Sequence, residues 1–129
     1  MRKKADELAR LQRLAQLRSD IEMRKLSVYR AHVTAAQSRI AVIEAKMQQL
    51  YASSAPFSVS EARLANALAG DHARQLVRAE ADLARMMPGF ESARAAAIRE
   101  YGRVRVLEEI RLSARVLAGD GQGSGKGPS

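Results

Sequence analysis

Cysteine and tryptophan are absent from this 129-residue chain, and only five of its residues are aromatic. Without cysteine there is neither a disulfide nor a thiolate metal ligand. The two histidines, His32 and His72, form no HExxH pattern, which argues against a zinc site or a Ser-His-Asp triad. No apolar run approaches the roughly 18 residues of a membrane-spanning helix. We therefore expect no enzyme, no cofactor and no metal.

Helix-forming residues dominate what remains. Apolar residues make up 47% of the chain, but many are alanine, and Ala, Leu, Arg, Glu and Gln all favour helices. This composition suits long helices better than a globular core, and it is typical of coiled coils. The basic start, MRKKADELAR, leads into an amphipathic pattern and does not indicate a signal peptide. We expect a soluble, cytoplasmic, all-α protein.

The stretch YASSAPFSVSEA interrupts the helical pattern near the middle of the chain. The residue before Pro56 is disfavoured in a helix, and Ser58 and Glu61 stand at the spacing of a capping box. We therefore predict a turn at about 53–57, with Ser58 as the N-cap of the helix that follows.

This turn divides the chain into two helices and a tail. We predict one helix over about 4–52 and a second over about 58–118. The five glycines of the ending AGDGQGSGKGPS predict a disordered tail at 119–129.

Both helices carry a heptad seam, in which apolar positions alternate in steps of three and four. In the first helix the later positions are Leu26, Tyr29, Val33, Ala36, Ile40, Ile43, Met47 and Leu50. In the second helix they are Ala62, Ala65, Ala69, His72, Leu76, Ala79, Leu83, Met86, Phe90, Ala93, Ala97, Glu100, Val104 and Leu107. The first half of the first helix carries its own ridge, which comprises Leu11, Leu14, Leu17 and Ile21. This ridge is out of phase with the later seam, so we predict a change of phase near Lys25.

Pro88 and Gly89 stand inside the second helix, but the heptad spacing continues through them. Proline removes its own amide donor and leaves the carbonyl of Ala84 without its helical partner. Because Ala84 faces away from the seam, water can satisfy that carbonyl. We predict a kink at Pro88-Gly89 within one helix; the alternative is a break that gives a three-helix bundle.

The seams predict a long antiparallel two-helix coiled-coil hairpin. With a turn centred near residue 55, facing residues sum to about 110. The expected facing pairs are Pro88 with Glu22, Glu100 with Arg10, and His72 with Ser38. Residues beyond about 109 then have no partner, and this apolar and basic overhang is a candidate docking surface.

The net charge of +8 is concentrated at one end of the expected hairpin. Residues 1–30 carry a net +5 and residues 99–118 a net +2, and the hairpin brings both to its open end. Such a field steers that end toward an acidic partner. The candidate partner-binding residues are Arg10, Arg13, Arg18, Arg103, Ile110, Arg111, Arg115 and Leu117.

An Ala/Arg-rich hairpin with this basic open end resembles the FliJ family, flagellar export stalks related to the YscO-type stalks of type III secretion. The resemblance covers residues 1 to about 118 and rests on the opening LARLQRLAQLRSDIEMRKL and the close AIREYGRVRVLEEIRLSARVL. It implies a non-enzymatic stalk or adaptor whose paired helix ends enter the export ATPase ring. It also implies contacts with the membrane export gate and with chaperones, in a cytoplasmic protein peripheral to the inner-membrane export apparatus. The basic open end would sit in the ring.

Two other function classes stay open. Basic coiled coils bind nucleic acid through phosphate contacts, but this chain has no recognised DNA motif and few aromatics for stacking. A generic scaffold or chaperone, including a parallel homodimeric coiled coil, would share the same composition. The near-matched helices and the tight turn favour a monomeric hairpin.

Overall fold

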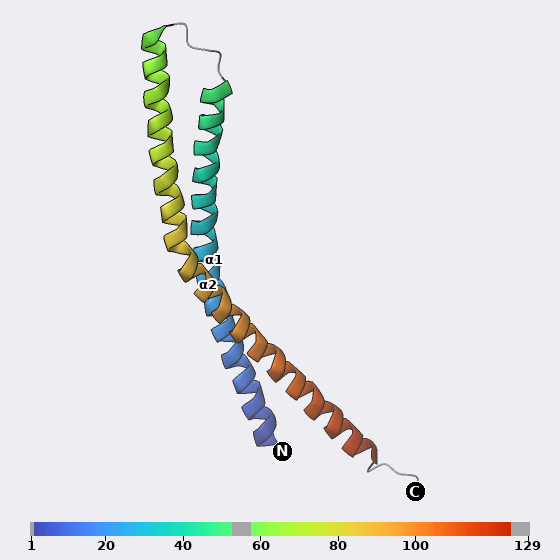
Figure 1. The fold of residues 1–129 in the computed structure, drawn as a ribbon. Coiled ribbons are helices and arrows are strands. Elements are labelled where there is room, and N and C mark those ends of the chain that lie inside the picture. The colour runs from blue at the N-terminus through green and yellow to red at the C-terminus, as the bar shows by residue number, and fades with distance from the viewer. Residues whose placement is uncertain (1, 53–57, 125–129) are drawn as a thin grey trace. The chain divides into compact units, whose positions relative to one another are not determined.

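The computed structural model describes residues 2–52 and 58–124. Helix α1 spans Arg2–Ala52 and helix α2 spans Val59–Ser124, and Ser58 is the one described residue outside them. The two helices run antiparallel (Figure 1), so the predicted all-α helical hairpin is confirmed. The predicted turn at 53–57 lies outside the described residues.

Both ends of the second helix can be compared with their predictions. At the start, Ser58 is the N-cap: the Glu61 amide donates to Ser58 Oγ at 3.1 Å, and the Ala62 amide donates to the Ser58 carbonyl at 3.0 Å. At the end, α2 continues to Ser124, past the predicted limit of about 118. Adding residues to an existing helix requires no new nucleation, so the extension carries only the cost of about 1 kcal/mol per glycine. The rest of the predicted tail, 125–129, lies outside the described residues.

Helix α2 is unbroken through Pro88, so the alternative of a break at that point is wrong. Every seam position predicted on α2, from Ala62 to Leu107, is buried or half-buried. Pro88 itself is exposed. One heptad phase therefore holds along α2 on both sides of the proline.

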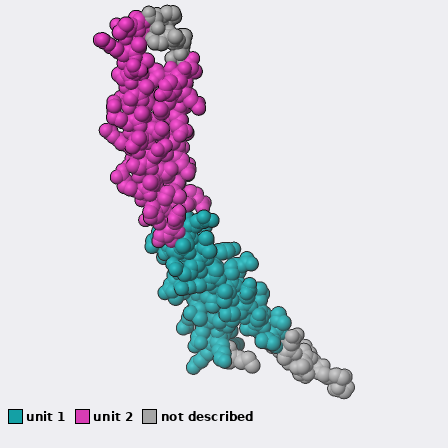
Figure 2. Space-filling model, in the orientation of Figure 1, with its two compact units in different colours: residues 1–26, 93–129 teal, residues 27–92 magenta. Residues whose placement is uncertain are grey.

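The helix pair divides into two units, coloured separately in Figure 2. Unit 1 combines Met1–Leu26 with Ala93–Ser129, and unit 2 is Ser27–Ser92. Each unit therefore contains one stretch of α1 and one stretch of α2.

Unit 2 buries large side chains in its seam, as the heptad pattern predicts. Val33, Ala36, Ile43 and Ala79 are buried. The half-buried members include Ile40, Met47, Leu50, Leu76, Leu83, Met86 and Phe90. Tyr29 is the exception, because 43% of it is exposed.

Gly89 explains the position of Tyr29. A Cβ atom on Gly89 would lie 2.8 Å from Cε1 of the Tyr29 ring, so only glycine leaves room for the ring in this pose. Gly89 is half-buried. Its role is to allow this close approach.

The register of unit 2 differs from the predicted one. Ile43 and Ala79 line the same groove, and Tyr29 lies against Gly89, so facing residues sum to about 120 and not to about 110. The predicted pair of His72 with Ser38 is therefore wrong, as is that of Pro88 with Glu22. The prediction assumed a symmetric turn, whereas side-chain fit along the seam determines the register.

The shifted register leaves the turn end of α2 without a facing stretch of α1. Ala52 lies level with about Ala69, so α2 from Val59 to about Leu68 extends past the end of α1, as Figure 1 shows. This overhang at the turn end of α2 was not predicted, because the prediction placed the unpaired residues only beyond about 109. Val59 and Leu64 in this stretch are 71% and 61% exposed.

The seam of unit 1 combines apolar, small and polar side chains. Ala15, Ser19, Leu26, Ala93, Ala97 and Val104 are buried, and the half-buried positions include Gln12, Glu22, Glu100 and Leu107. On α1 the seam keeps one heptad phase from Leu8 to Leu50. The predicted change of phase near Lys25 is wrong, because paired helices share one seam period and α2 has no phase change.

Candidate partner-binding surface

All eight predicted partner-binding residues belong to unit 1. The residues of this unit include 15 Lys/Arg and eight Asp/Glu, so it carries seven of the eight net charges. Unit 2 has seven Lys/Arg and six Asp/Glu, a net charge of only +1. The predicted charge asymmetry therefore coincides with the division of the chain into units.

The leucine ridge of unit 1, which we define as Leu11, Leu14, Leu17 and Ile21, faces solvent. These four side chains are 50%, 46%, 60% and 49% exposed, in that order. Sequence analysis placed them in the seam, and that placement is wrong. Leu14 immediately precedes the seam residue Ala15, and Ile21 immediately precedes Glu22. One residue turns a helix by about 100°, which carries the ridge out of the seam.

A groove beside the ridge separates the two helices of unit 1. Leu11, Leu14 and Ala15 line it from α1, and Val106 and Leu107 line it from α2. Its volume is about 380 Å³. Because Val106 is 54% exposed, apolar side chains border the groove on both sides.

Charged side chains complete the lining of this groove. Arg18 contributes from α1, and Arg103 and Glu100 from α2. Arg103 donates to Glu100 Oε1 at 3.0 Å, and Glu100 Oε2 is buried without a hydrogen-bond partner. Glu100 therefore has Arg103 as its ion-pair partner, and the predicted pair with Arg10 is wrong. Arg18 forms no ion pair within the described ranges, so the groove stays positive.

The C-terminal part of α2 contains the remaining predicted residues. Arg111 donates to Gln12 Oε1 and lines a second small groove with Arg115, so Arg111 does not lie in an unpaired overhang. Beyond it, every residue from 112 to 119 is exposed, including Leu117 at 71%. Residues 2–7 of α1 are exposed throughout as well. The helices thus share no seam beyond Arg111.

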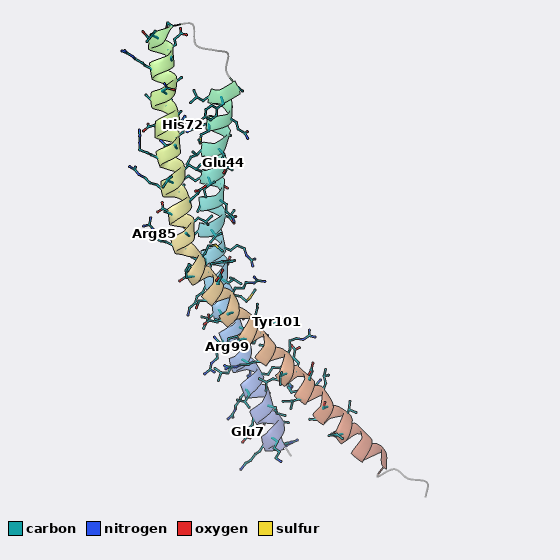
Figure 3. The ribbon with its side chains drawn as sticks, viewed as in Figure 1. Glu7, Glu44, His72, Arg85, Arg99 and Tyr101 are labelled. Atoms are coloured by element: carbon teal, nitrogen blue, oxygen red, sulfur yellow. The ribbon has the colours of Figure 1, made fainter. Side chains whose placement is uncertain are left out.

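Exposed residues continue around unit 1. Figure 3 labels Arg99 and Tyr101 on its α2 stretch and Glu7 on its α1 stretch. Tyr101 is 54% exposed and Ile98 is 61% exposed. The periodicity of the sequence identified neither Tyr101 nor Ile98 as an exposed apolar residue.

Unit 2 presents a different groove, which the sequence did not reveal. Arg39, Lys46 and Arg78 line it around the half-exposed Val42. The one acidic side chain in its lining, Asp82, accepts a hydrogen bond from Arg85. His72, labelled in Figure 3, lies farther along the seam, where its Nδ1 is buried without a partner.

Within 2–52 and 58–124, no three His, Asp or Glu side chains gather in a way that could hold a metal ion. Neither described helix contains a stretch long and apolar enough to cross a membrane.

Comparisons of the chain with family models, curated proteins and solved structures find no match. The charge, the leucine ridge and the grooves of unit 1 are the structural features that bear on its function.

Proposed function

We propose that this protein is a non-enzymatic stalk or adaptor of a bacterial flagellar or type III protein export apparatus. The helix ends in unit 1 dock into the ring of the export ATPase and couple it to the export gate. The protein would act in the cytoplasm, peripheral to the inner-membrane apparatus, as a monomeric hairpin. The proposal rests on the resemblance to FliJ-type stalks.

One structural observation supports a docking role for unit 1. This unit combines seven net positive charges with large exposed apolar side chains that its own seam does not use, among them Leu11, Leu14 and Ile21. Positive charge speeds association with an acidic partner, and apolar side chains then supply contact area. Unit 2, which is nearly neutral, is left for the gate or for chaperones.

The test is ATP hydrolysis by the cognate export ATPase, with and without the protein, at near-physiological salt. We expect stimulation that is lost in the double variant Arg111→Glu, Arg115→Glu. The matched control is Arg74→Glu, Arg78→Glu, which reverses two charges at the same spacing on α2 but in unit 2. Circular dichroism checks that both variants stay helical.

Three outcomes would count against the proposal. Absence of both stimulation and co-sedimentation would remove the stalk role. An equal loss in both double variants would show that general charge, and not the unit 1 end, is recognised. Full stimulation by the Arg111, Arg115 variant would show that docking uses another surface.

The alternative function is nucleic-acid binding by a basic coiled coil. The groove of Arg39, Lys46 and Arg78 in unit 2 favours it, because three cations face one concave surface. Phosphate binding by such clusters weakens steeply with salt. A gel shift that persists at physiological salt and is lost in Arg39→Gln, Lys46→Gln would support this function over the stalk role; loss of the shift at that salt would exclude it.

A further inference from the structure

We propose that the leucine ridge and the adjoining groove of unit 1 bind the apolar face of an amphipathic helix with acidic flanks. The binding mode is a helix in a groove, in which apolar anchors at helical spacing fit between two facing walls. This proposal does not depend on the export role, because it rests on the surface of unit 1 alone.

The apolar part of the site has two walls. Leu11 and Leu14 of the ridge border the groove on α1, and Val106 borders it on α2. Ile110, four residues after Val106, lies on the same face of α2 and is 45% exposed. A third helix lying along this groove would cover apolar side chains from both walls.

The charges around the ridge select the occupant. On a helix, residues three or four positions away are surface neighbours. For the four ridge residues, the charged neighbours at these spacings are Arg10, Arg13, Arg18, Arg24, Lys25, Glu7 and Asp20. Five of these seven carry positive charge, so acidic side chains beside the occupant's apolar face would find partners.

The charge also argues against a second copy of the chain. Two copies joined through their ridges would bring two units of net charge +7 together. Like charges held this close repel, and complementary charge favours another partner. The occupant is therefore a helix from a different, acidic protein.

The ridge is free for binding because the hairpin does not use it. Buried Ala15 and Ser19 close the α1 side of the seam in unit 1, while the ridge side chains stay about half exposed. Replacing Leu14 or Ile21 with glutamine keeps a good helix former at each position. Such variants should fold as the unchanged protein does.

The experiment uses a synthetic helical peptide with leucine at the a and d heptad positions and glutamate at e and g. Fluorescence anisotropy with the full chain, at near-physiological salt, should show saturable binding. We expect Leu14→Gln, Ile21→Gln to weaken it by about tenfold or more, as for loss of central apolar anchors. The matched control, Leu64→Gln, Leu68→Gln, removes two exposed leucines from unit 2 and should leave binding unchanged.

A second peptide, with lysine in place of glutamate, tests the charge. Equal binding of both peptides would overturn the acidic partner, and no binding of the acidic peptide would overturn the site. An equal loss in the unit 2 control would show unspecific apolar adhesion. Light scattering measures the oligomeric state of the wild-type chain and of the Leu14→Gln, Ile21→Gln variant. A wild-type dimer that becomes a monomer in this variant would show that the ridge binds a second copy of the chain, and would overturn the acidic partner.

Discussion

Ile43 and Ile21 lie on the same helix, but Ile43 in unit 2 is 5% exposed and Ile21 in unit 1 is 49% exposed. The contrast extends to the surroundings of both residues. Ile43 lies in the seam of unit 2, where Val33 is also buried, whereas Ile21 belongs to a ridge that lies outside the seam, beside the buried Ala15 and Ser19. Unit 1 also carries seven of the eight net charges. The comparison shows that residues of one type on one helix are buried in the seam in one unit and exposed outside it in the other.

The largest expected effect tests this contrast with one substitution at two sites. Ile43→Ala should lower the free energy of unfolding by about 2–4 kcal/mol, because it leaves a cavity in the seam. Ile21→Ala should change it by no more than about 0.5 kcal/mol, because the side chain is on the surface. Urea unfolding followed by circular dichroism measures both.

An equal loss in the free energy of unfolding at Ile43 and Ile21 would contradict the difference between the two units and place Ile21 in the core. If Ile43→Ala is unfolded at the start of the titration, the valine pair serves instead. Ile43→Val should then cost about 0.5–1.5 kcal/mol, while Ile21→Val should leave the urea midpoint unchanged.

A second prediction concerns the small side chains of the unit 1 seam. Ala97 is 2% exposed, so Ala97→Leu should push the helices apart and cost about 1–3 kcal/mol. Ala95→Leu, on the exposed face two residues away, should be nearly neutral. The midpoints of thermal unfolding of the two variants give the difference. A more stable Ala97→Leu variant would show that unit 1 is underpacked and not closely packed.

Two glycines give a smaller pair of effects, a gain at one site and no gain at the other. Gly102 in unit 1 has no atom within 4 Å of an added Cβ, so Gly102→Ala should stabilise α2 by about 1 kcal/mol. Gly89→Ala in unit 2 should lose that gain, because its Cβ would meet the Tyr29 ring. Adding Tyr29→Ala should restore the gain at Gly89 in a double-mutant cycle. Equal stabilisation by both alanines in the presence of Tyr29 would mean that the ring moves aside freely.

The smallest expected effect separates the units by charge. Raising ionic strength from about 0.01 M to about 0.15 M shortens the Debye length from about 30 Å to about 8 Å. This screening should relieve repulsion in unit 1 and raise amide exchange protection a few-fold at α1 residues 8–26. Protection at residues 33–50 should stay the same, because unit 2 is nearly neutral. A uniform change over α1 would show that the charge asymmetry does not affect local stability.

Features set by local sequence were predicted well. The cap at Ser58 follows from its own side chain and the next three residues, and the phase of α2 from Ala62 to Leu107 follows from its spacing. The location of the basic candidate residues in one unit was also predictable, because charge counts can be read from the sequence.

Features set by the partner helix were not predictable from periodicity. Leu14 and Ile21 look like core residues on their own helix, and only the phase of α2 excludes them from the seam. The register depends on the fit of Tyr29 against Gly89, a contact between residues 60 positions apart. The candidate surface was therefore predicted in its charge but missed in its apolar part.

Three ridge residues each stand one position before a seam residue, so a deletion of one residue would exchange the two sets. Loss of a single codon between Ile21 and Leu26 would rotate the preceding part of α1 by about 100°. Leu11, Leu14 and Ile21 would then take the seam places of Gln12, Ala15 and Glu22. A chain with that deletion would bring large apolar side chains into the seam and lose an outward apolar surface in one step. Deleting Met23 makes the same change in the laboratory. The number of residues in α1 before Leu26 would then determine whether the ridge side chains pack in the seam or face solvent.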